Sequence, residues 1–149
     1  MAAVRTTRAA IPEMIRRGGG AIVTIGSVDA FYPDPGVLST TAPSRPRSPT
    51  LPRPCRRSSA PRVFARNSIS PGPVLTDLWL GEGGVAEVIG KASGASPQEV
   101  ADGAVFGTPT GRFTTPDEVA DLTLFLASDR AANIAGADMT IDGGFITTV

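Results

Sequence analysis

The apolar positions near the start of the chain fall into a helical pattern followed by a strand pattern. Residues 4–17 carry apolar side chains at helical spacing, and three glycines separate them from the short apolar run 21–25. A run of this kind, bounded by glycines, is typical of a strand buried in a parallel sheet. A second buried strand is predicted at 67–70, where a Pro-Gly-Pro turn stops it.

The carboxyl-terminal part contains two clear helix starts. Residues 96–99 and 115–118 each combine an N-cap hydroxyl, a proline at the first helical position and a glutamate three residues after the cap. The second of these helices is predicted to stop near 128–129, and a last strand is predicted at 138–141. Gly81, Gly83, Gly84 and Gly90 interrupt residues 76–94, which predicts short helical pieces in a mobile flap and not a core helix.

This order of elements predicts the α/β fold class. Helices and buried strands alternate, as they do in a doubly wound parallel sheet. The 149 residues are compatible with one domain, which we divide into three segments. These are a helix–strand segment at 1–38, an irregular insert at 39–66, and a strand, flap, helix and last strand at 67–149.

The insert 39–66 has a composition unlike that of its flanks. Its 28 residues include six prolines, seven arginines and five serines, with no lysine and no acidic residue. The rest of the chain carries 7 basic and 14 acidic residues, so the net charge of zero is the sum of a basic insert and an acidic remainder. Proline removes backbone donors and clashes with the preceding helical turn, so we expect no stable helix in this insert.

The residue inventory excludes several kinds of site. The chain has no histidine and one cysteine, Cys55, which excludes Ser-His-Asp triads, His-based zinc sites and an internal disulfide. No metal site is therefore predicted. The apolar runs are too short to cross a bilayer, and the first residues lack the apolar stretch of a secretory leader. These features favour a cytoplasmic protein without membrane contact.

Four segments resemble the carboxyl-terminal half of a short-chain dehydrogenase/reductase, in that family's order and spacing. They are GGGAIVTIGS at 18–27, NSISPGPVLT at 67–76, GRFTTPDEVADLTLFLASD at 111–129 and DMTIDGG at 138–144. The resemblance implies a partial Rossmann-type sheet whose amino-terminal half is missing from these residues. It also implies NAD or NADP as the cofactor, and hydride transfer between an alcohol and a carbonyl on a small-molecule substrate.

The same resemblance assigns site residues. In the family a serine binds the substrate oxygen, and Ser27 matches this catalytic serine. The loop that contacts the nicotinamide end of the cofactor matches Pro71, Gly72, Pro73, Val74 and Thr76. The helix at 116–128 and the last strand often form subunit contacts in the family, which implies a possible homo-oligomer.

Two further catalytic groups of the family are not found. Its general acid/base is a tyrosine, whose pKa a lysine four residues later lowers from about 10. The family spacing would place these at Thr40 and Ser44, whereas the chain's only tyrosine and only lysine are Tyr32 and Lys91. The family's T-G-x-x-x-G-x-G cofactor turn is also not found in these residues, so we expect the chain to be inactive.

The insert has three interpretations. Its basic residues suit contact with nucleic acid or an acidic partner, and its proline spacing suits an SH3-type partner. The third interpretation is an out-of-frame reading, because back-translation with permitted codons and a frame shift gives DYSAVKAALTNLAKALSKEFGAAGIR. This string places Tyr-x-x-x-Lys at the position of Thr40. We favour two compensating frameshifts, near 37–39 and 65–67, because a partner-binding role does not explain why the break replaces the catalytic helix.

Overall fold

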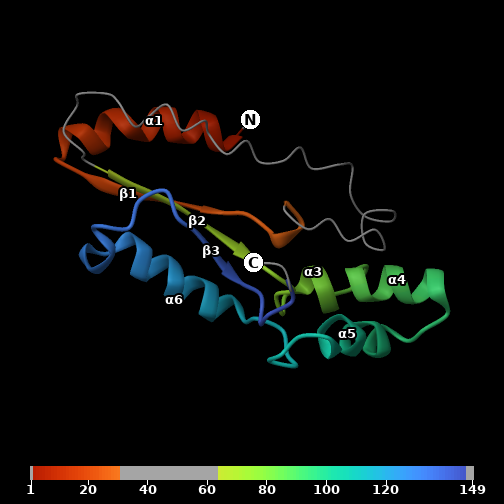
Figure 1. The fold of residues 1–149 in the computed structure, drawn as a ribbon. Helices are drawn as coiled ribbons and strands as arrows, with labels where there is room; N and C mark the ends of the chain where they lie inside the picture. Colours follow the sequence, from red (N-terminus) through yellow and green to blue (C-terminus); the bar gives the residue numbers. More distant parts are fainter. Residues whose placement is uncertain (1, 31–63, 147–149) are drawn as a thin grey trace.

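The computed structural model describes residues 2–30 and 64–146, which form a three-stranded parallel sheet (Figure 1). The strands are β1 (Gly20–Ile25), β2 (Phe64–Pro71) and β3 (Asp138–Ile141), in the order β1-β2-β3. The predicted α/β class with a parallel sheet is confirmed. β2 is longer than the predicted 67–70, because it begins three residues inside the segment whose composition suggests irregular structure.

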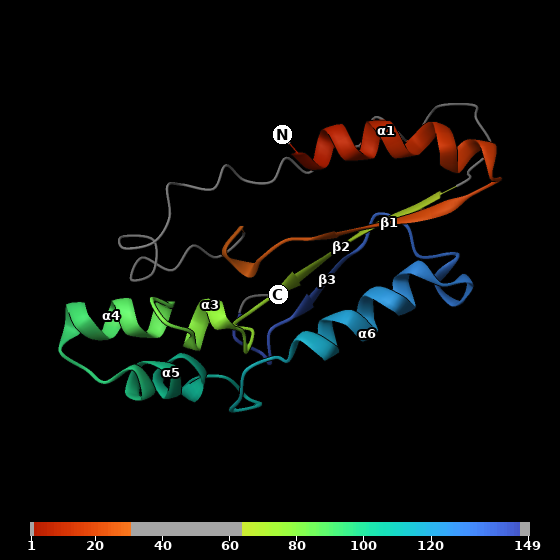
Figure 2. The same ribbon diagram turned by 180° about the vertical axis from the view of Figure 1, so that it is seen from behind.

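Two helices lie on opposite faces of the sheet (Figures 1 and 2). α1 (Ala2–Arg16) forms at the predicted place and continues through Pro12, and it passes into β1 through a glycine turn. A Cβ at Gly20 would lie 2.8 Å from the Cε of Met14, so the glycine lets this end of α1 approach the strand. α6 (Pro116–Ala127) covers the other face, against β1 and β2.

The hydrophobic core lies between the sheet and α6. Its fully buried members are Ile69, Leu126 and Ala131, with Val119, Leu122, Phe125 and Met139 among the side chains packed around them. Alternation along β2 directs Ile69 toward α6 and turns Ser68 and Ser70 to the opposite face. Full burial of an aliphatic side chain contributes about 1.5–3 kcal/mol, so Ile69 and Leu126 each stabilise this layer by that order.

A buried amide fixes the approach to β3. Asn67 is 3% exposed, and its Nδ2 donates to the carbonyl of Ile134 at 2.9 Å. Its Oδ1 accepts from the backbone N–H of Ala137 at 3.1 Å. Both polar ends of the amide are thus satisfied by a segment about 70 residues away, which explains how a polar residue fits inside a buried strand.

A three-helix unit lies beyond the carboxyl ends of the strands (Figure 1). It consists of α3 (Asp77–Leu80), α4 (Val85–Ser93) and α5 (Pro97–Phe106), which pack on one another. The predicted helix starts before α5 and α6 are confirmed, since Ser96 and Thr115 each form a capping box. None of the helices in 2–30 and 64–146 combines the length and the apolar character that a membrane crossing needs.

The prediction that Gly90 interrupts the helical pattern is wrong. α4 runs through Gly90, which is buried, and a Cβ at this position would lie 2.7 Å from the carbonyl oxygen of Ala95. The glycine therefore serves close packing between α4 and the segment that enters α5. The glycines between 81 and 84 do separate α3 from α4, as the pattern indicates.

Candidate functional site at the carboxyl edge of the sheet

The sheet brings the predicted site residues to one edge. β1 and β2 are aligned with Ile25 beside Ile69, and β2 and β3 with Pro71 beside Ile141. The Gly26 N–H donates to the Ile69 carbonyl at 2.7 Å, and the Gly72 N–H donates to the Ile141 carbonyl at 3.0 Å. Because the strands are parallel, the residues that follow them share the edge where α/β sheets bind ligands.

Ser27 begins a short turn at the end of β1. Its Oγ accepts from the Asp29 N–H at 3.2 Å, and its carbonyl accepts from the Ala30 N–H at 3.1 Å. These bonds stabilise a single turn of 3₁₀ helix at Val28–Ala30. The side chain is half-buried, and accepting one bond leaves the hydroxyl proton free to be donated elsewhere. The geometry is compatible with binding a substrate oxygen while also serving the turn.

The loop after β2 is held tightly against its neighbours. A Cβ at Gly72 would lie 2.7 Å from the Cβ of Asp142, so only glycine fits there. The Pro73 carbonyl accepts from the Thr114 N–H at 3.0 Å, and the Leu75 N–H donates to the Thr114 carbonyl at 2.8 Å. These two bonds form an isolated parallel bridge between Val74 and Thr114.

Thr76 ends this loop and starts α3. Its carbonyl accepts from the N–H groups of Trp79 and Leu80, at 2.9 and 3.1 Å. Its exposed side chain donates from Oγ1 to the Val74 carbonyl at 3.4 Å. The five residues predicted to contact the cofactor thus lie in the segment from the last residue of β2 to the N-cap of α3.

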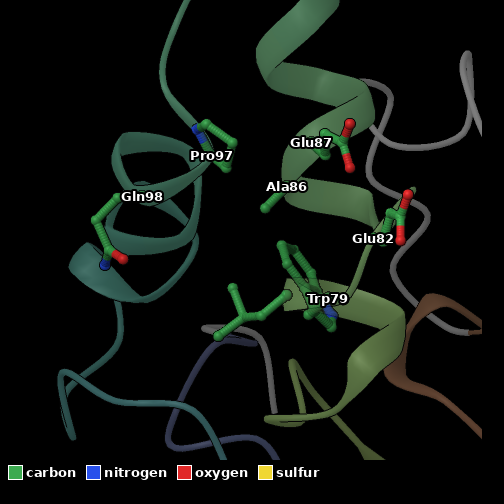
Figure 3. Close-up of a pocket in the computed structure, with 8 residues that line it drawn as sticks. Trp79, Glu82, Ala86, Glu87, Pro97 and Gln98 are labelled. Atoms are coloured by element: carbon green, nitrogen blue, oxygen red, sulfur yellow. The ribbon is translucent and has the colours of Figure 1, made fainter.

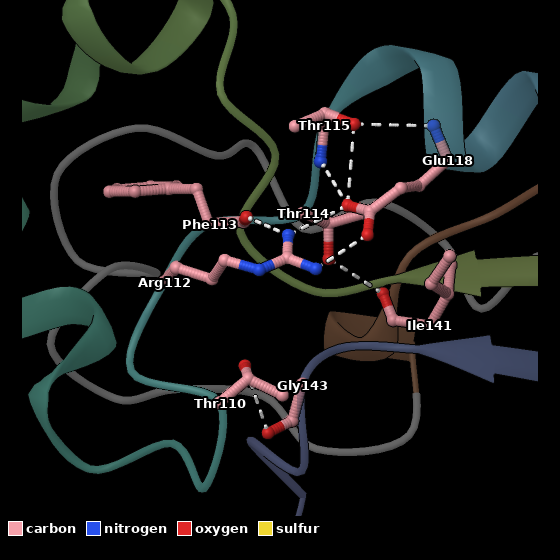
Figure 4. A network of polar contacts seen from close by, with 8 residues as sticks. All are labelled: Thr110, Arg112, Phe113, Thr114, Thr115, Glu118, Ile141 and Gly143. Carbon is pink, nitrogen blue, oxygen red and sulfur yellow. Dashed lines mark hydrogen bonds and ion pairs between the residues drawn. The ribbon is translucent and has the colours of Figure 1, made fainter.

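A polar network surrounds the start of α6 (Figure 4). Arg112 donates to both carboxylate oxygens of Glu118, from Nη1 at 2.9 Å and from Nη2 at 2.6 Å. Glu118 also accepts from the Thr115 N–H at 2.8 Å, which completes the capping box. These bonds lower the pKa of Glu118 to about 2. The bond from the Arg112 guanidinium has the largest effect, and the bond from the Thr115 N–H has the next largest. The sequence shows the capping box, but Arg112 lies in a loop and its partner follows only from the fold.

The turn after β3 is packed against the loop that precedes α6. The Thr110 N–H donates to the Gly143 carbonyl at 3.3 Å. Gly143 and Gly144 have φ values of +65° and +84°, a region that favours glycine. A Cβ at Gly143 would collide with the Thr110 hydroxyl, and one at Gly144 would lie 2.7 Å from the ring of Pro109. The two glycines of the Asp-Gly-Gly sequence are therefore required because a side chain at either position would collide with its neighbours.

Of the remaining groups that matter for proton transfer, the structure describes only Lys91. Lys91 lies on α4 and forms an ion pair with Glu87 of the same helix. Tyr32, Thr40 and Ser44 fall outside the residues that the structure describes. Among the predicted site residues, the fold thus unites Ser27 with the loop 71–76.

Two pockets occur in and below the three-helix unit. One has a volume of about 290 Å³ and lies between α3, α4 and α5, where Trp79, Ala86 and Pro97 line it (Figure 3). The other, of about 370 Å³, lies between α5 and the loop 111–115. Neither lining includes Ser27 or residues 71–74, and the second pocket reaches the loop 71–76 only at Leu75.

Comparison with known proteins decides the family. A family model described as enoyl-(acyl carrier protein) reductase matches residues 1–146. The chain belongs to the short-chain dehydrogenase/reductase family. This confirms the assignment implied by the four sequence segments, and with it a Rossmann-type sheet.

Relatives of this short-chain dehydrogenase/reductase are oxidoreductases by name. The chain is 29% identical to the 3-oxoacyl-(acyl-carrier-protein) reductase of Thermotoga maritima, over 94% of this chain and 51% of that protein. It is 33% identical to the D-beta-hydroxybutyrate dehydrogenase of Rhizobium meliloti, over 94% of this chain and 53% of that protein.

A solved structure resembles the whole chain. The L-sorbose reductase from Gluconobacter frateurii, complexed with NADPH and L-sorbose, matches with a TM-score of 0.73 and 26% identity. The match covers 100% of this chain and 56% of the reductase. The chain thus spans about half the length of the relatives that it matches.

Proposed function

We propose that this chain is the carboxyl-terminal half of an NAD(P)-dependent oxidoreductase that interconverts an alcohol and a carbonyl, and that the chain as written does not catalyse the reaction. One observation carries the proposal. Ser27 and the loop 71–76 lie at the carboxyl edge of the sheet, while the only lysine of the chain lies on α4, where it pairs with Glu87.

The consequence for chemistry follows from proton transfer. Reduction of a carbonyl places a negative charge on its oxygen, and a positioned acid must supply a proton there. Such a general acid typically contributes about 10²–10⁴ to the rate. Ser27 can donate a hydrogen bond to that oxygen, but a serine hydroxyl by itself is a poor proton donor. Without a Tyr-x-x-x-Lys pair, the site can orient a carbonyl but cannot complete its reduction.

The cofactor and the subunit contacts belong to the same proposal. NAD or NADP would place its nicotinamide end against Pro71, Gly72, Pro73, Val74 and Thr76. A homo-oligomer would use α6 and β3, and support comes from Leu124, whose side chain is 68% exposed on α6. We also expect a cytoplasmic protein, because the chain contains a single cysteine.

The direct test is turnover by the purified chain. Oxidation of NADH and NADPH would be followed by absorbance with a panel of small aldehydes and ketones, and we expect no rate above the protein-free control. A measurable rate in the parent chain that disappears in Ser27→Ala would show that the site is active and would contradict the proposed inactivity. NADPH fluorescence, read with Gly72→Val as the matched control, tests separately whether the loop 71–76 still binds cofactor.

We further propose that the segment 39–66 arose by two compensating frameshifts. The support is its composition, together with the Tyr-x-x-x-Lys pair that a shifted frame restores thirteen residues after Ser27. Accurate nucleotide sequencing of the region tests this. Two shifts would identify a decayed gene. A single corrected frame with Tyr-x-x-x-Lys would identify a working reductase, and one uninterrupted frame encoding 39–66 as written would contradict the idea.

The alternative partners of the basic segment, nucleic acid or an SH3-type domain, stay predictions, because that segment is almost wholly outside the described residues.

A further inference from the structure

The three-helix unit α3–α5 is joined to the sheet by a narrow connection. Its helices pack chiefly on one another, α4 on α5 and α3 on α4. The chain enters the unit through residues 73–76 and leaves it through residues 107–115 (Figure 1). The entering and leaving segments meet at the two backbone hydrogen bonds between Thr114 and residues 73 and 75. Together with the contacts of Pro109 and Thr110 with the turn after β3, these few bonds join the unit to the sheet.

The space below the unit is open. The pocket of about 370 Å³ has Leu80, Ala101 and Val105 of the unit on one side and the loop 111–115 on the other. Segments with few buried apolar contacts open locally at lower free energy than the core of the same protein. The position of the unit is therefore not fixed by packing at this place, and polar contacts at the loop carry more weight.

Arg112 is the centre of these polar contacts (Figure 4). Its guanidinium binds Glu118 on α6 with two hydrogen bonds, and its Nη1 also donates to the Phe113 carbonyl at 3.0 Å. The Phe113 ring meets Trp79 of α3 edge to face, with centroids 5.4 Å apart and an angle of 67°. A continuous chain of contacts thus leads from α6 through Arg112 and Phe113 to α3.

We propose that Arg112 is a positioning residue, which holds the α3–α5 unit in place over the carboxyl edge by tying Phe113 to Glu118. An exposed ion pair contributes little to global stability, and 56% of the Arg112 side chain is exposed. The same interaction has a large local effect when it determines the balance between two positions of a loosely packed unit. Loss of Arg112 therefore releases the unit and leaves the sheet unchanged.

Trp79 provides the readout, because it is the only tryptophan of the chain and lies on the path that Arg112 controls. The experiment measures acrylamide quenching of Trp79 and hydrogen exchange of the full chain in Arg112→Ala, Arg112→Lys and Glu118→Gln. The Glu118→Gln variant removes the charge while keeping an oxygen for the Thr115 N–H. Lys91→Ala is the matched control, since it removes an exposed ion pair that lies within the unit.

The expected result is local. In Arg112→Ala, quenching of Trp79 rises about twofold and exchange in 97–106 accelerates about threefold, which corresponds to the modest energy of one exposed pair. Exchange in 20–25 and 67–71 stays at the parent rate, and Lys91→Ala changes neither signal. Arg112→Lys, with a charge but no fork of donors, gives an intermediate value.

Three outcomes would overturn the proposal. Unchanged quenching in both Arg112→Ala and Glu118→Gln would show that the unit is held by other contacts. Faster exchange spread evenly over strands and helices would show general destabilisation in place of release. A parent chain whose Trp79 is already quenched as freely as the isolated amino acid would equally contradict it, because no position would then be held.

Discussion

The sheet with α6 and the unit α3–α5 are built on different principles. The first buries large side chains, with Ile69 and Leu126 almost fully removed from solvent. The second fully buries only small residues, Ala86, Gly90 and Ala101, and exposes some of its large apolar residues, Leu78 at 71% and Phe106 at 90%. Helix packing on small residues brings backbones close but removes little apolar area from water. Helical content is therefore a poor guide to where this chain is stable.

The largest difference between the two regions should appear when one large side chain is truncated in each. Ile69→Ala deletes buried methyl groups under α6 and leaves a cavity, so we expect a loss of about 2–5 kcal/mol in unfolding free energy. Leu80→Ala, at a position that is 50% exposed, should lose less than about 1 kcal/mol. Urea unfolding of both variants measures the difference, and equal losses would show that the two regions share one core.

A second comparison uses two glycines of the three-helix unit. Gly90→Ala places a methyl group against the Ala95 carbonyl and should destabilise by about 1–3 kcal/mol, because the helices must separate. Gly103→Ala meets nothing within 4 Å and should stabilise α5 by about 0.5–1 kcal/mol. Thermal melts of the two variants should therefore shift in opposite directions. Stabilisation by Gly90→Ala would disprove the close packing of α4 on residue 95.

The capping boxes and Gly90 show which features can be predicted from the sequence alone and which cannot. The capping boxes at Ser96 and Thr115 are local, since the donor and acceptor lie three residues apart, and they are confirmed. The role of Gly90 depends on a contact with residue 95 across a turn, and the pattern misreads it as a helix break. Asn67 and Arg112 find partners through tertiary structure, one about 70 residues away and the other across a loop. For the site, the strand ends place Ser27 and 71–76 together, while the missing tyrosine and lysine are visible only by comparison with a family motif.

The caps themselves give a third, smaller test. Thr115→Ala and Ser96→Ala each remove an N-cap acceptor, and each should cost about 1 kcal/mol of helix stability. We expect Thr115→Ala to lower the global unfolding free energy, because α6 covers the core. Ser96→Ala should mainly accelerate hydrogen exchange within 97–106. Similar global losses from both would indicate that the three-helix unit unfolds together with the sheet.

The smallest effect concerns pH. Arg112 and the Thr115 N–H lower the pKa of Glu118 from 4.5 to about 2, so the folded state favours the ionised carboxylate. Its contribution is complete above the unfolded pKa of about 4.5 and disappears as the pH falls toward 2. The melting temperatures of the parent and Glu118→Gln should therefore differ at pH 6 and converge as the pH approaches 2. A difference that stays constant over this range would assign the effect to packing and not to charge.

The glycines that follow β3 have a consequence for how variation in this chain should be interpreted. Gly143 and Gly144 leave no room for a side chain beside Thr110 and Pro109, and both have positive φ. Almost any replacement would push away the loop on which the start of α6 depends. A deep mutational scan would therefore find these two positions as intolerant of substitution as catalytic residues. The glycines contribute only the absence of a side chain. Mutational intolerance at this edge of the sheet is therefore not evidence that the enzyme still works.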